Sequence, residues 1–322
     1  MAQLRSLSLF SGCQGLDLGM EKKGIKACAF VDSDSTCRET IRINCPRAII
    51  FKDVFDSEVL NFARNTQIDV VVGGPPCQSF STIGKRDFLH DPRGKALLGF
   101  IAVVKAACPE YFVLENVQGI ISAEKGKIIR QLRSHFVRLG YNVSWSLLNA
   151  SDFGVPQLRK RFVMLGCKSR LLHMPIPKVK PKTLREAICD LEEHPGSFSP
   201  FSDAMQEVMS HVPEGGCWRD LPTKMQDKSM GNANRKSGGL TAFYRRLAYN
   251  KPSPTLLTSP TQRATTLCHP KQTRPLSVLE YKRIQCFPDN WKLAGSTRSQ
   301  YRQLGNAVPV LLGKAIGNML IA

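Results

Sequence analysis

The chain has 322 residues, of which 42% are hydrophobic, and this composition supports a large buried core and excludes a disordered protein. Its 11 cysteines are scattered, odd in number and contain no C-x-x-C pair, which argues against a disulfide scaffold and against a structural zinc site. The 45 Lys and Arg residues outnumber the 26 Asp and Glu residues and give a formal net charge of +19, which favours a polyanionic partner.

Targeting segments are not expected in this sequence. No apolar run approaches the length of a membrane span. The first residues, MAQLRSLSLFSGC, lack the long apolar stretch of a signal peptide. We therefore expect a reduced cytoplasmic protein without membrane contact.

The first half of the chain alternates strand-like and helix-like stretches. Apolar runs bounded by turn residues predict strands at residues 4–10, 25–32, 48–53, 68–74, 111–116 and 161–166. Apolar residues at helical spacing predict helices at residues 15–24, 34–44, 94–108, 126–140 and 306–320. Such alternation is typical of an α/β fold, with a mostly parallel sheet and helices on both faces.

Polar and reactive residues follow the predicted strands. The loop FSGCQG (residues 10–15) comes after the first strand, Asp32 and Asp53 after the second and third, Cys77 after the fourth and Glu115 after the fifth. Ligands of open α/β sheets bind at the carboxyl ends of the strands. We therefore expect these residues to line a single cleft.

The composition changes near residue 173. The stretch HMPIPKVKPKT (residues 173–183) is typical of a linker, and residues up to about 272 are rich in Pro, Ser, Thr and Gly. We expect a smaller, irregular domain there. Residues 232–302 contain 13 Lys and Arg against only Glu280 and Asp289, a local net charge of +11, which points to nucleic acid.

Each candidate ligand-binding residue that follows the first three predicted strands also has a purely structural interpretation. The loop at residues 10–15 can approach a ligand through its backbone or be a plain tight turn. Asp32 can accept hydrogen bonds from ribose hydroxyls or be a solvated strand end. Asp53 can accept from an adenine amino group or cap a helix.

The later candidates carry similar alternatives. Glu115 ends an apolar strand, so it is either a carboxyl group of raised pKa that protonates a ring nitrogen or a partner for an arginine. Arg159 and Arg161 fall on one side of an extended segment and suit phosphate or carbonyl oxygens, or else belong to a solvated strand. Cys77 is either a nucleophile, held in place by the stiff Pro75–Pro76 turn, or a small buried hydrophobic residue.

Taken in order, the motifs resemble those of the DNA (cytosine-5) methyltransferase family, in its prokaryotic restriction–modification form. They are FSGCQG, GGPPCQSFS, DPRGK, ENV, QLRKR, RPLSVLEYKRIQCFPD and YRQLGNAVP. The resemblance covers residues 4–166 and 274–322. It implies a Rossmann-like, S-adenosylmethionine-dependent methyltransferase fold with a catalytic domain at residues 1–175, completed by residues 300–322. Residues 176–299 would form an irregular target-recognition domain and hinge.

The resemblance also implies roles for single residues. Cys77 would add to C6 of a flipped-out cytosine, Glu115 would hydrogen bond at N3 and the exocyclic amine, and Arg159 and Arg161 would hold the O2 side. Contacts to S-adenosylmethionine are implied for Phe10, Gly12, Gly15, Leu16, Asp32, Asp53, Pro75 and Asn306. Contacts to DNA are expected for Ser81, Arg93, Arg245, Arg246, Arg263 and Lys271, and no metal is expected. The threonines of RATTLCHP (residues 263–270) could contact base edges.

Three residues depart from the family pattern. Gln14 stands at a place where the family usually has glycine, Asp32 where it often has glutamate, and Ala96 where a larger apolar residue is common. Because the Asp32 side chain is shorter than that of glutamate, its contact with the ribose would be displaced.

The expected substrate is double-stranded DNA, and a companion restriction endonuclease is a functional partner. We expect a monomer, either nucleoid-associated in a prokaryotic cytoplasm or encoded by a phage. The alternative is a tRNA cytosine-5 methyltransferase, although the Cys-Phe-Thr stretch of that branch is absent. A DNA-binding protein that has lost catalysis is a second alternative, opposed by the intact Cys77, Glu115 and Arg161.

Overall fold

The computed structural model describes residues 3–76, 94–174, 179–230 and 243–321, and the chain divides into two compact units. The first unit comprises Met1–Phe153, Lys160–Val179 and Val308–Ala322, and the second comprises Gly154–Arg159 and Lys180–Ala307. The expected limit at residue 175 lies four residues before Val179 and the expected limit at residue 300 lies eight residues before Val308. Gly154–Arg159, expected in the catalytic domain, belongs to the second unit. That the second unit recognises the target remains a prediction.

A seven-stranded sheet forms the centre of the first unit, with the strand order β3-β2-β1-β4-β5-β7-β6. The strands are β1 (Leu4–Leu9), β2 (Ile25–Val31), β3 (Ile49–Phe51), β4 (Val70–Gly73), β5 (Tyr111–Val117), β6 (Asn142–Asn149) and β7 (Lys160–Cys167). All pairings among β1 to β5 are parallel, and β7 runs antiparallel to both β5 and β6. The predicted mostly parallel α/β fold is therefore confirmed.

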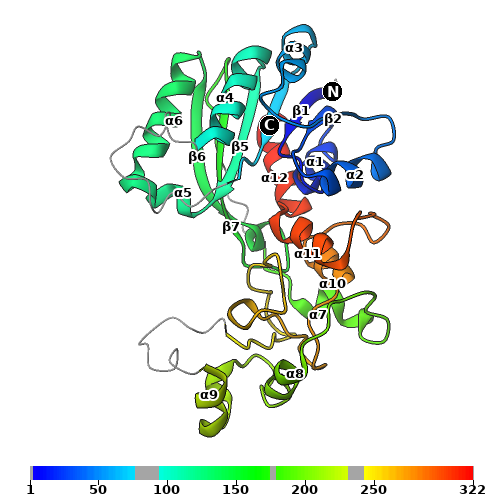
Figure 1. The fold of residues 1–322 in the computed structure, drawn as a ribbon. Coiled ribbons are helices and arrows are strands. Elements are labelled where there is room, and N and C mark those ends of the chain that lie inside the picture. The colour runs from blue at the N-terminus through cyan, green and yellow to red at the C-terminus, as the bar shows by residue number, and fades with distance from the viewer. Residues whose placement is uncertain (1–2, 77–93, 175–178, 231–242, 322) are drawn as a thin grey trace. The chain divides into compact units, whose positions relative to one another are not determined.

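Helices cover both faces of this sheet (Figure 1). One face carries α1 (Gly15–Glu21), α2 (Ser35–Asn44) and α12 (Val310–Ile321), and the other carries α3 (Ser57–Asn65), α4 (Lys95–Ala107), the short α5 (Gly119–Ser122) and α6 (Lys127–Arg138). The apolar stripe predicted on α6 faces inward, since Ile128, Leu132 and Phe136 are all buried in the main core. Burial of such stripes, rather than helix propensity, supplies most of the stability of these helices.

Besides α5 and short 3-10 turns, the strand β6 and the helix α3 of the first unit were not predicted. The edge strand β6 has Val143, Trp145 and Leu147 in alternation, a period of two that signals a half-buried strand. The helix α3 begins after Asp56 and buries only Val59 and Ala63, so its apolar stripe is short. The apolar pattern in the sequence of each element was present but weak.

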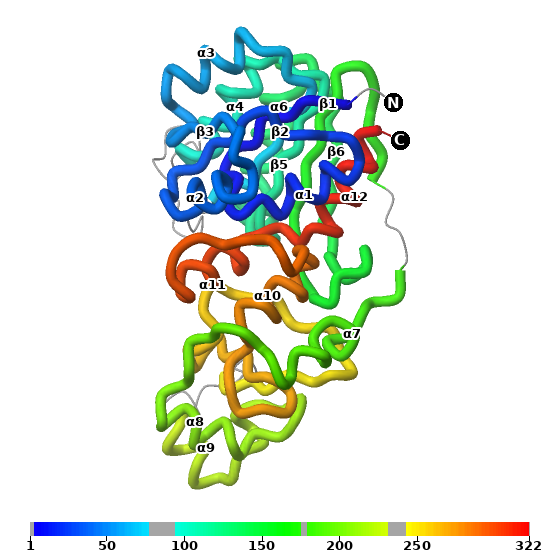
Figure 2. The backbone as a smooth tube through the Cα atoms, turned by 90° about the vertical axis from the view of Figure 1, so that its right-hand side faces the viewer, coloured from blue at the N-terminus to red at the C-terminus, as the bar shows by residue number. Residues whose placement is uncertain are grey.

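The helices α1 and α12 touch backbone to backbone, although they lie near opposite ends of the chain (Figure 2). A Cβ atom added at Gly19 would lie 2.2 Å from the carbonyl oxygen of Val310, and one at Gly313 would lie 2.6 Å from the carbonyl oxygen of Leu16. Only glycine permits this approach at either position. The C-terminal segment is thus an integral part of the first unit.

One stretch, Thr297–Ile321, is long and apolar enough by composition to cross a membrane, contrary to the sequence-based expectation. Most of its apolar part is buried inside the protein, as in the core helix of a soluble protein, so it is weak evidence for a membrane span. The stretch also contains a break, because α11 ends at Asn306 and α12 begins only at Val310, after Pro309.

The second unit consists of short helices, 3-10 turns and loops, with no sheet strand among its described residues. Its helices are α7 (Leu184–Ile188), α8 (Asp203–Ser210), α9 (Thr223–Met230), α10 (Val278–Ile284) and α11 (Thr297–Asn306). It has a separate apolar cluster around Met209, Trp218 and Tyr244. The irregular character expected from the Pro- and Ser-rich composition is therefore present.

Candidate functional site

The carboxyl ends of β1, β2, β4 and β5 lie at one edge of the sheet, because these strands are parallel neighbours. The loop after β1, Asp32 after β2, the Gly74–Pro76 turn after β4 and Glu115 near the end of β5 all belong to this edge. The cleft predicted from strand order therefore has its physical basis in the observed topology.

The loop after β1 has an unusual backbone that only a few residues tolerate. Phe10, Gly12 and Gln14 have φ angles of 55°, 54° and 68°, in the left-handed region that favours glycine. Gln14 is the N-cap residue of α1, so the residue that departs from the family pattern occupies a conformation suited to glycine. Its side chain is buried, and its amide nitrogen lies 3.5 Å from Sγ of Cys45.

Asp32 holds this loop in place. Its Oδ2 accepts a hydrogen bond of 2.7 Å from the backbone N–H of Gly12, and its Oδ1 accepts one of 2.9 Å from Asp34. Burial raises the pKa of the Asp32 carboxyl, and these two hydrogen bonds oppose the rise. The carboxylate of Asp32 is therefore a rigid, partly desolvated acceptor next to the glycine loop, not a freely solvated strand end.

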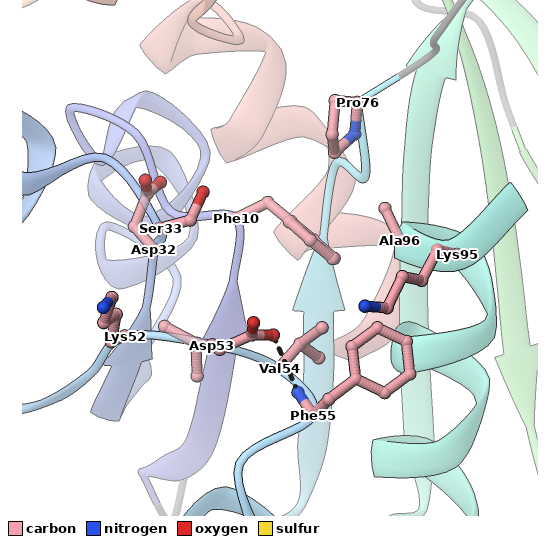
Figure 3. Close-up of a pocket in the computed structure, with 11 residues that line it drawn as sticks. Phe10, Asp32, Ser33, Lys52, Asp53, Val54, Phe55, Pro76, Lys95 and Ala96 are labelled. Carbon is pink, nitrogen blue, oxygen red and sulfur yellow. Dashed lines mark hydrogen bonds between the residues drawn. The ribbon is translucent and has the colours of Figure 1, made fainter. Parts of the chain in front are cut away.

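A pocket of about 240 Å³ opens between these elements (Figure 3). It is lined by Phe10, Val31, Asp32, Ser33, Lys52, Asp53, Val54, Phe55, Pro76, Lys95 and Ala96. Phe10, Asp32 and Asp53 were predicted to bind a cofactor, and the structure brings all three to this pocket. Apolar walls with carboxylates at their edges suit a ligand with a planar ring and hydroxyl or amino donors.

Several pocket residues were missed in the sequence. The ring of Phe55 follows Asp53 by two residues, and Nζ of Lys95 lies 5.2 Å from its centroid. A Cβ atom at Gly99, one helical turn after Lys95, would lie 2.4 Å from Cγ1 of Val54. The sequence offered one sign that Val54 and Phe55 line the pocket, which is that they directly follow Asp53, a predicted cofactor contact.

Asp53 does not cap a helix through its side chain. Its Oδ1 accepts a hydrogen bond of 3.0 Å from the backbone N–H of Phe55, and its own N–H donates to Oδ2 of Asp56. This is a local Asx turn that fixes the carboxyl group at the pocket.

Glu115 forms a buried ion pair at the end of β5. Its Oε1 lies 2.9 Å from Nε of Arg161, and the two side chains are only 10% and 11% exposed. Burial lowers the pKa of Arg161, while the charge of Glu115 and its hydrogen bond raise it. The sequence left two interpretations of Glu115 open, a carboxyl group of raised pKa and a partner for an arginine. The structure contains the arginine partner, Arg161.

The turn that leads to Cys77 rests on the same strand end. The side-chain amide of Asn116 donates a hydrogen bond of 3.0 Å to the carbonyl oxygen of Pro75. A Cβ atom at Gly74 would lie 2.6 Å from Oε2 of Glu115. The Gly74–Pro76 turn and the carboxylate of Glu115 are thus packed against each other.

The close approach at Gly74 predicts a large effect of a small substitution. In Gly74→Ala the new methyl group must displace the Glu115 carboxylate and disturb its pair with Arg161. We expect the turnover of the reaction catalysed at this site to fall at least about tenfold, measured at saturating substrate. Gly119→Ala is the matched control, because a Cβ atom there meets nothing within 4 Å. Equal activity of the two variants would contradict this geometry.

Arg159 and Arg161, predicted to fall on one side of an extended segment, have different partners in the structure. Arg159 belongs to the second unit and is fully buried. Its guanidinium donates to the carbonyl oxygens of Leu256 and Gly305, at 3.0 and 2.7 Å. Arg161 belongs to the first unit. Arg159 therefore stabilises the interior of the second unit, and a direct contact with substrate does not fit this arrangement.

The remaining predicted cofactor residues do not line the pocket. Gly12 and Pro75 lie in the loops described above, whereas Gly15 and Leu16 are buried at the start of α1. Asn306 is the exposed last residue of α11, in the second unit. Their predicted contacts remain predictions.

The predicted DNA-contact residues differ in their environment. Cys77, Ser81 and Arg93 lie outside the described residues. Arg263 and Lys271 are exposed, and Nζ of Lys271 lies 3.7 Å from Oε1 of Glu192.

The two adjacent arginines at 245 and 246 are less accessible. Arg245 is half-buried, which lowers its pKa. Arg246 is buried and donates to the carbonyl oxygens of Val212, His269, Gln272 and Met209. These bonds hold the loops of the second unit together, so the predicted DNA contact of Arg246 does not fit this position. Among the described residues, no group of His, Cys, Asp or Glu could hold a metal ion.

Asp17 on α1 is a buried carboxyl group. Desolvation raises its pKa to about 6, and the Ser8 side chain opposes this rise. Its Oδ1 has no hydrogen-bond partner within the described part of the chain.

Ionised Asp17 therefore costs folding free energy at neutral pH. The unfolded group titrates near pH 3.8 and the folded one near 6, so the cost appears as the pH rises between these values and is complete above 6. We expect Asp17→Asn to gain on the order of 2–3 kcal/mol of stability relative to the native protein between pH 4 and pH 7. Urea unfolding across this range measures the difference, and parallel pH profiles of the two proteins would contradict the prediction.

Comparisons with known proteins agree with this architecture. The model of the family described as C-5 cytosine-specific DNA methylase matches residues 4–322. The chain is 38% identical to the type II methyltransferase M.Sau96I of Staphylococcus aureus, covering 97% of this chain and 74% of that protein. It is 36% identical to M.Eco47II of Escherichia coli, covering 98% and 78%. Among solved structures, EhMeth of Entamoeba histolytica has a TM-score of 0.72 at 17% identity, covering 100% of this chain and 98% of that one.

Proposed function

The chain belongs to the C-5 cytosine-specific DNA methylase family, and from this premise we propose that it methylates C5 of a cytosine within a specific double-stranded DNA sequence, with S-adenosylmethionine as the methyl donor. The observation that supports this most directly is the buried Glu115–Arg161 pair beside the turn that leads to Cys77. A carboxylate and a guanidinium beside that turn suit a pyrimidine ring as ligand.

The pocket supports the choice of cofactor. Asp32 and Asp53 both offer carboxylate oxygens at this pocket, and the ring of Phe10 also lines it (Figure 3). These acceptors suit ribose hydroxyls and an adenine amino group, and the apolar wall suits a purine face. S-adenosylmethionine would supply an electrophilic methyl group here.

The chain's own residues would perform the covalent steps. The thiolate of Cys77 adds to C6 of the cytosine, which makes C5 electron-rich enough to accept the methyl group. In its protonated form Glu115 donates its proton to N3 and accepts a hydrogen bond from the exocyclic amine, so it neutralises the negative charge that reaches N3 as the carbon–sulfur bond forms. Water or another base then takes the C5 proton, the electrons of the C5–H bond re-form the C5–C6 double bond, and the thiolate of Cys77 leaves. C6 is inaccessible in a stacked duplex, so the base must be flipped out.

The name of type II methyltransferase carried by the relatives supports a role in restriction–modification. We infer that methylation protects host DNA from a companion endonuclease, which need not bind this chain. A monomer in a prokaryotic cytoplasm, or one encoded by a phage, fits this role.

Trapping on a modified substrate tests the proposal. Duplex DNA with 5-fluorocytosine at the target position cannot lose a proton from C5, so the proposed reaction should stop at a covalent protein–DNA adduct. We expect the adduct only with S-adenosylmethionine present and only on duplex DNA of the recognised sequence. Methylation of tRNA but not of duplex DNA would overturn the proposed substrate, and methylation of DNA without any adduct would overturn the covalent route.

A further inference from the structure

An exposed turn in the second unit is held by its own polar groups. It surrounds the 3-10 helix η9 (Arg263–Thr265). The Thr265 hydroxyl donates to the carbonyl oxygen of Ser259 at 3.0 Å, and the Thr266 hydroxyl donates to that of Gln262 at 2.8 Å. Each bond closes a small ring within residues 259–267, so the turn has little conformational freedom.

The turn is also anchored to the rest of its unit. The backbone N–H of Tyr244 donates to the carbonyl oxygen of Arg263 at 3.1 Å, and that of Leu267 donates to Pro260 at 3.1 Å. Nη1 of Arg263 donates to the carbonyl oxygen of Ser229 at 2.9 Å. The direction of the Arg263 side chain is thus set by the protein before any partner arrives.

This arrangement changes which side chains can contact a base. The threonines were predicted to contact base edges, but their hydroxyl protons are used within the turn, and Thr266 is only 1% exposed. Gln262 and Arg263 are exposed at the same turn. Within the described residues, the Gln262 side chain has no hydrogen bond, and Nε and Nη2 of Arg263 have none.

We propose that this turn reads the DNA sequence, with Arg263 reading a guanine in the major groove and Gln262 reading a neighbouring base. The proposal rests on the proposed function, that the substrate is duplex DNA. With Nη1 bound to Ser229, Nε and Nη2 form the two-donor edge that matches O6 and N7 of guanine. The Gln262 amide can both donate and accept, which a base edge requires and a phosphate does not.

The effect of Arg263→Lys distinguishes a contact with a base from a contact with a phosphate. Lysine keeps the positive charge but loses the fixed two-donor edge. If Arg263 reads guanine, discrimination at one base pair should fall by roughly 5- to 150-fold in both Arg263→Lys and Arg263→Ala. If it only neutralises a phosphate, Arg263→Lys should keep the native sequence preference.

Bisulfite sequencing of a duplex library randomised around the recognised sequence measures this. We expect Arg263→Lys and Gln262→Ala each to relax one position, and Arg219→Lys and Gln206→Ala, which are exposed elsewhere in the unit, to keep the native pattern. A native pattern in Arg263→Lys or in Gln262→Ala overturns the role of that residue alone. Failure of the native protein to methylate any duplex would instead overturn the proposed function.

Discussion

Replacing Cys77 by serine should abolish methyl transfer while leaving the fold and DNA binding nearly unchanged. Serine keeps the size of the side chain, but its hydroxyl is a far weaker nucleophile than a thiolate at neutral pH. We expect the turnover number to fall by roughly 10⁴-fold or more. The measurement is transfer of labelled methyl groups to duplex DNA, together with the 5-fluorocytosine adduct, which should disappear.

The control for Cys77→Ser is another cysteine. Cys189 is an exposed free thiol in the second unit, so Cys189→Ser should keep native activity. A Cys77→Ser variant that retains native turnover would exclude covalent addition by this residue, whatever the control does.

Changing Glu115 to glutamine should lower both activity and stability. Glutamine keeps the shape of the side chain but removes the charge that pairs with Arg161 at 2.9 Å. Activity should fall about 10²- to 10⁴-fold, because glutamine cannot transfer a proton to N3 as the thiolate adds to the ring. Stability should fall by about 3 kcal/mol, because the guanidinium of Arg161 is left buried without its counter-charge.

Glu58→Gln is the matched control for this change, since Glu58 is exposed on α3 in the same unit. It should alter the free energy of unfolding by less than about 0.5 kcal/mol. Methyl-transfer rates and urea unfolding of the two variants give both comparisons. If Glu115→Gln loses activity without losing stability, the ion pair is not what holds Arg161 in place.

The part of the site that could be predicted from sequence is the part fixed by strand order. Asp32, Asp53 and Glu115 each follow an apolar run, and parallel strands bring such residues to one edge whatever the details of packing. The same argument located Phe10 at the pocket. In these cases the local pattern and the topology agree, so few alternatives remain.

What could not be predicted depends on contacts between distant segments. The period-two pattern placed Arg159 and Arg161 on one face, but the chain passes from one unit to the other between them. Arg246 was expected to bind DNA because it is an arginine in a basic segment, yet carbonyl oxygens from four separate residues surround its guanidinium. Nothing in the neighbouring sequence indicates which backbone carbonyls will be near an arginine.

The glycine contacts between α1 and α12 have a consequence for biosynthesis. During translation the glycine loop and α1 emerge early, whereas the helix that packs against α1 is made only after the whole second unit. A nascent chain on the ribosome therefore has a first unit that lacks one of its face-covering helices. Competence to modify DNA should appear only after synthesis has passed residue 321, and a chain arrested earlier should be a substrate for proteolysis instead of a partly active enzyme.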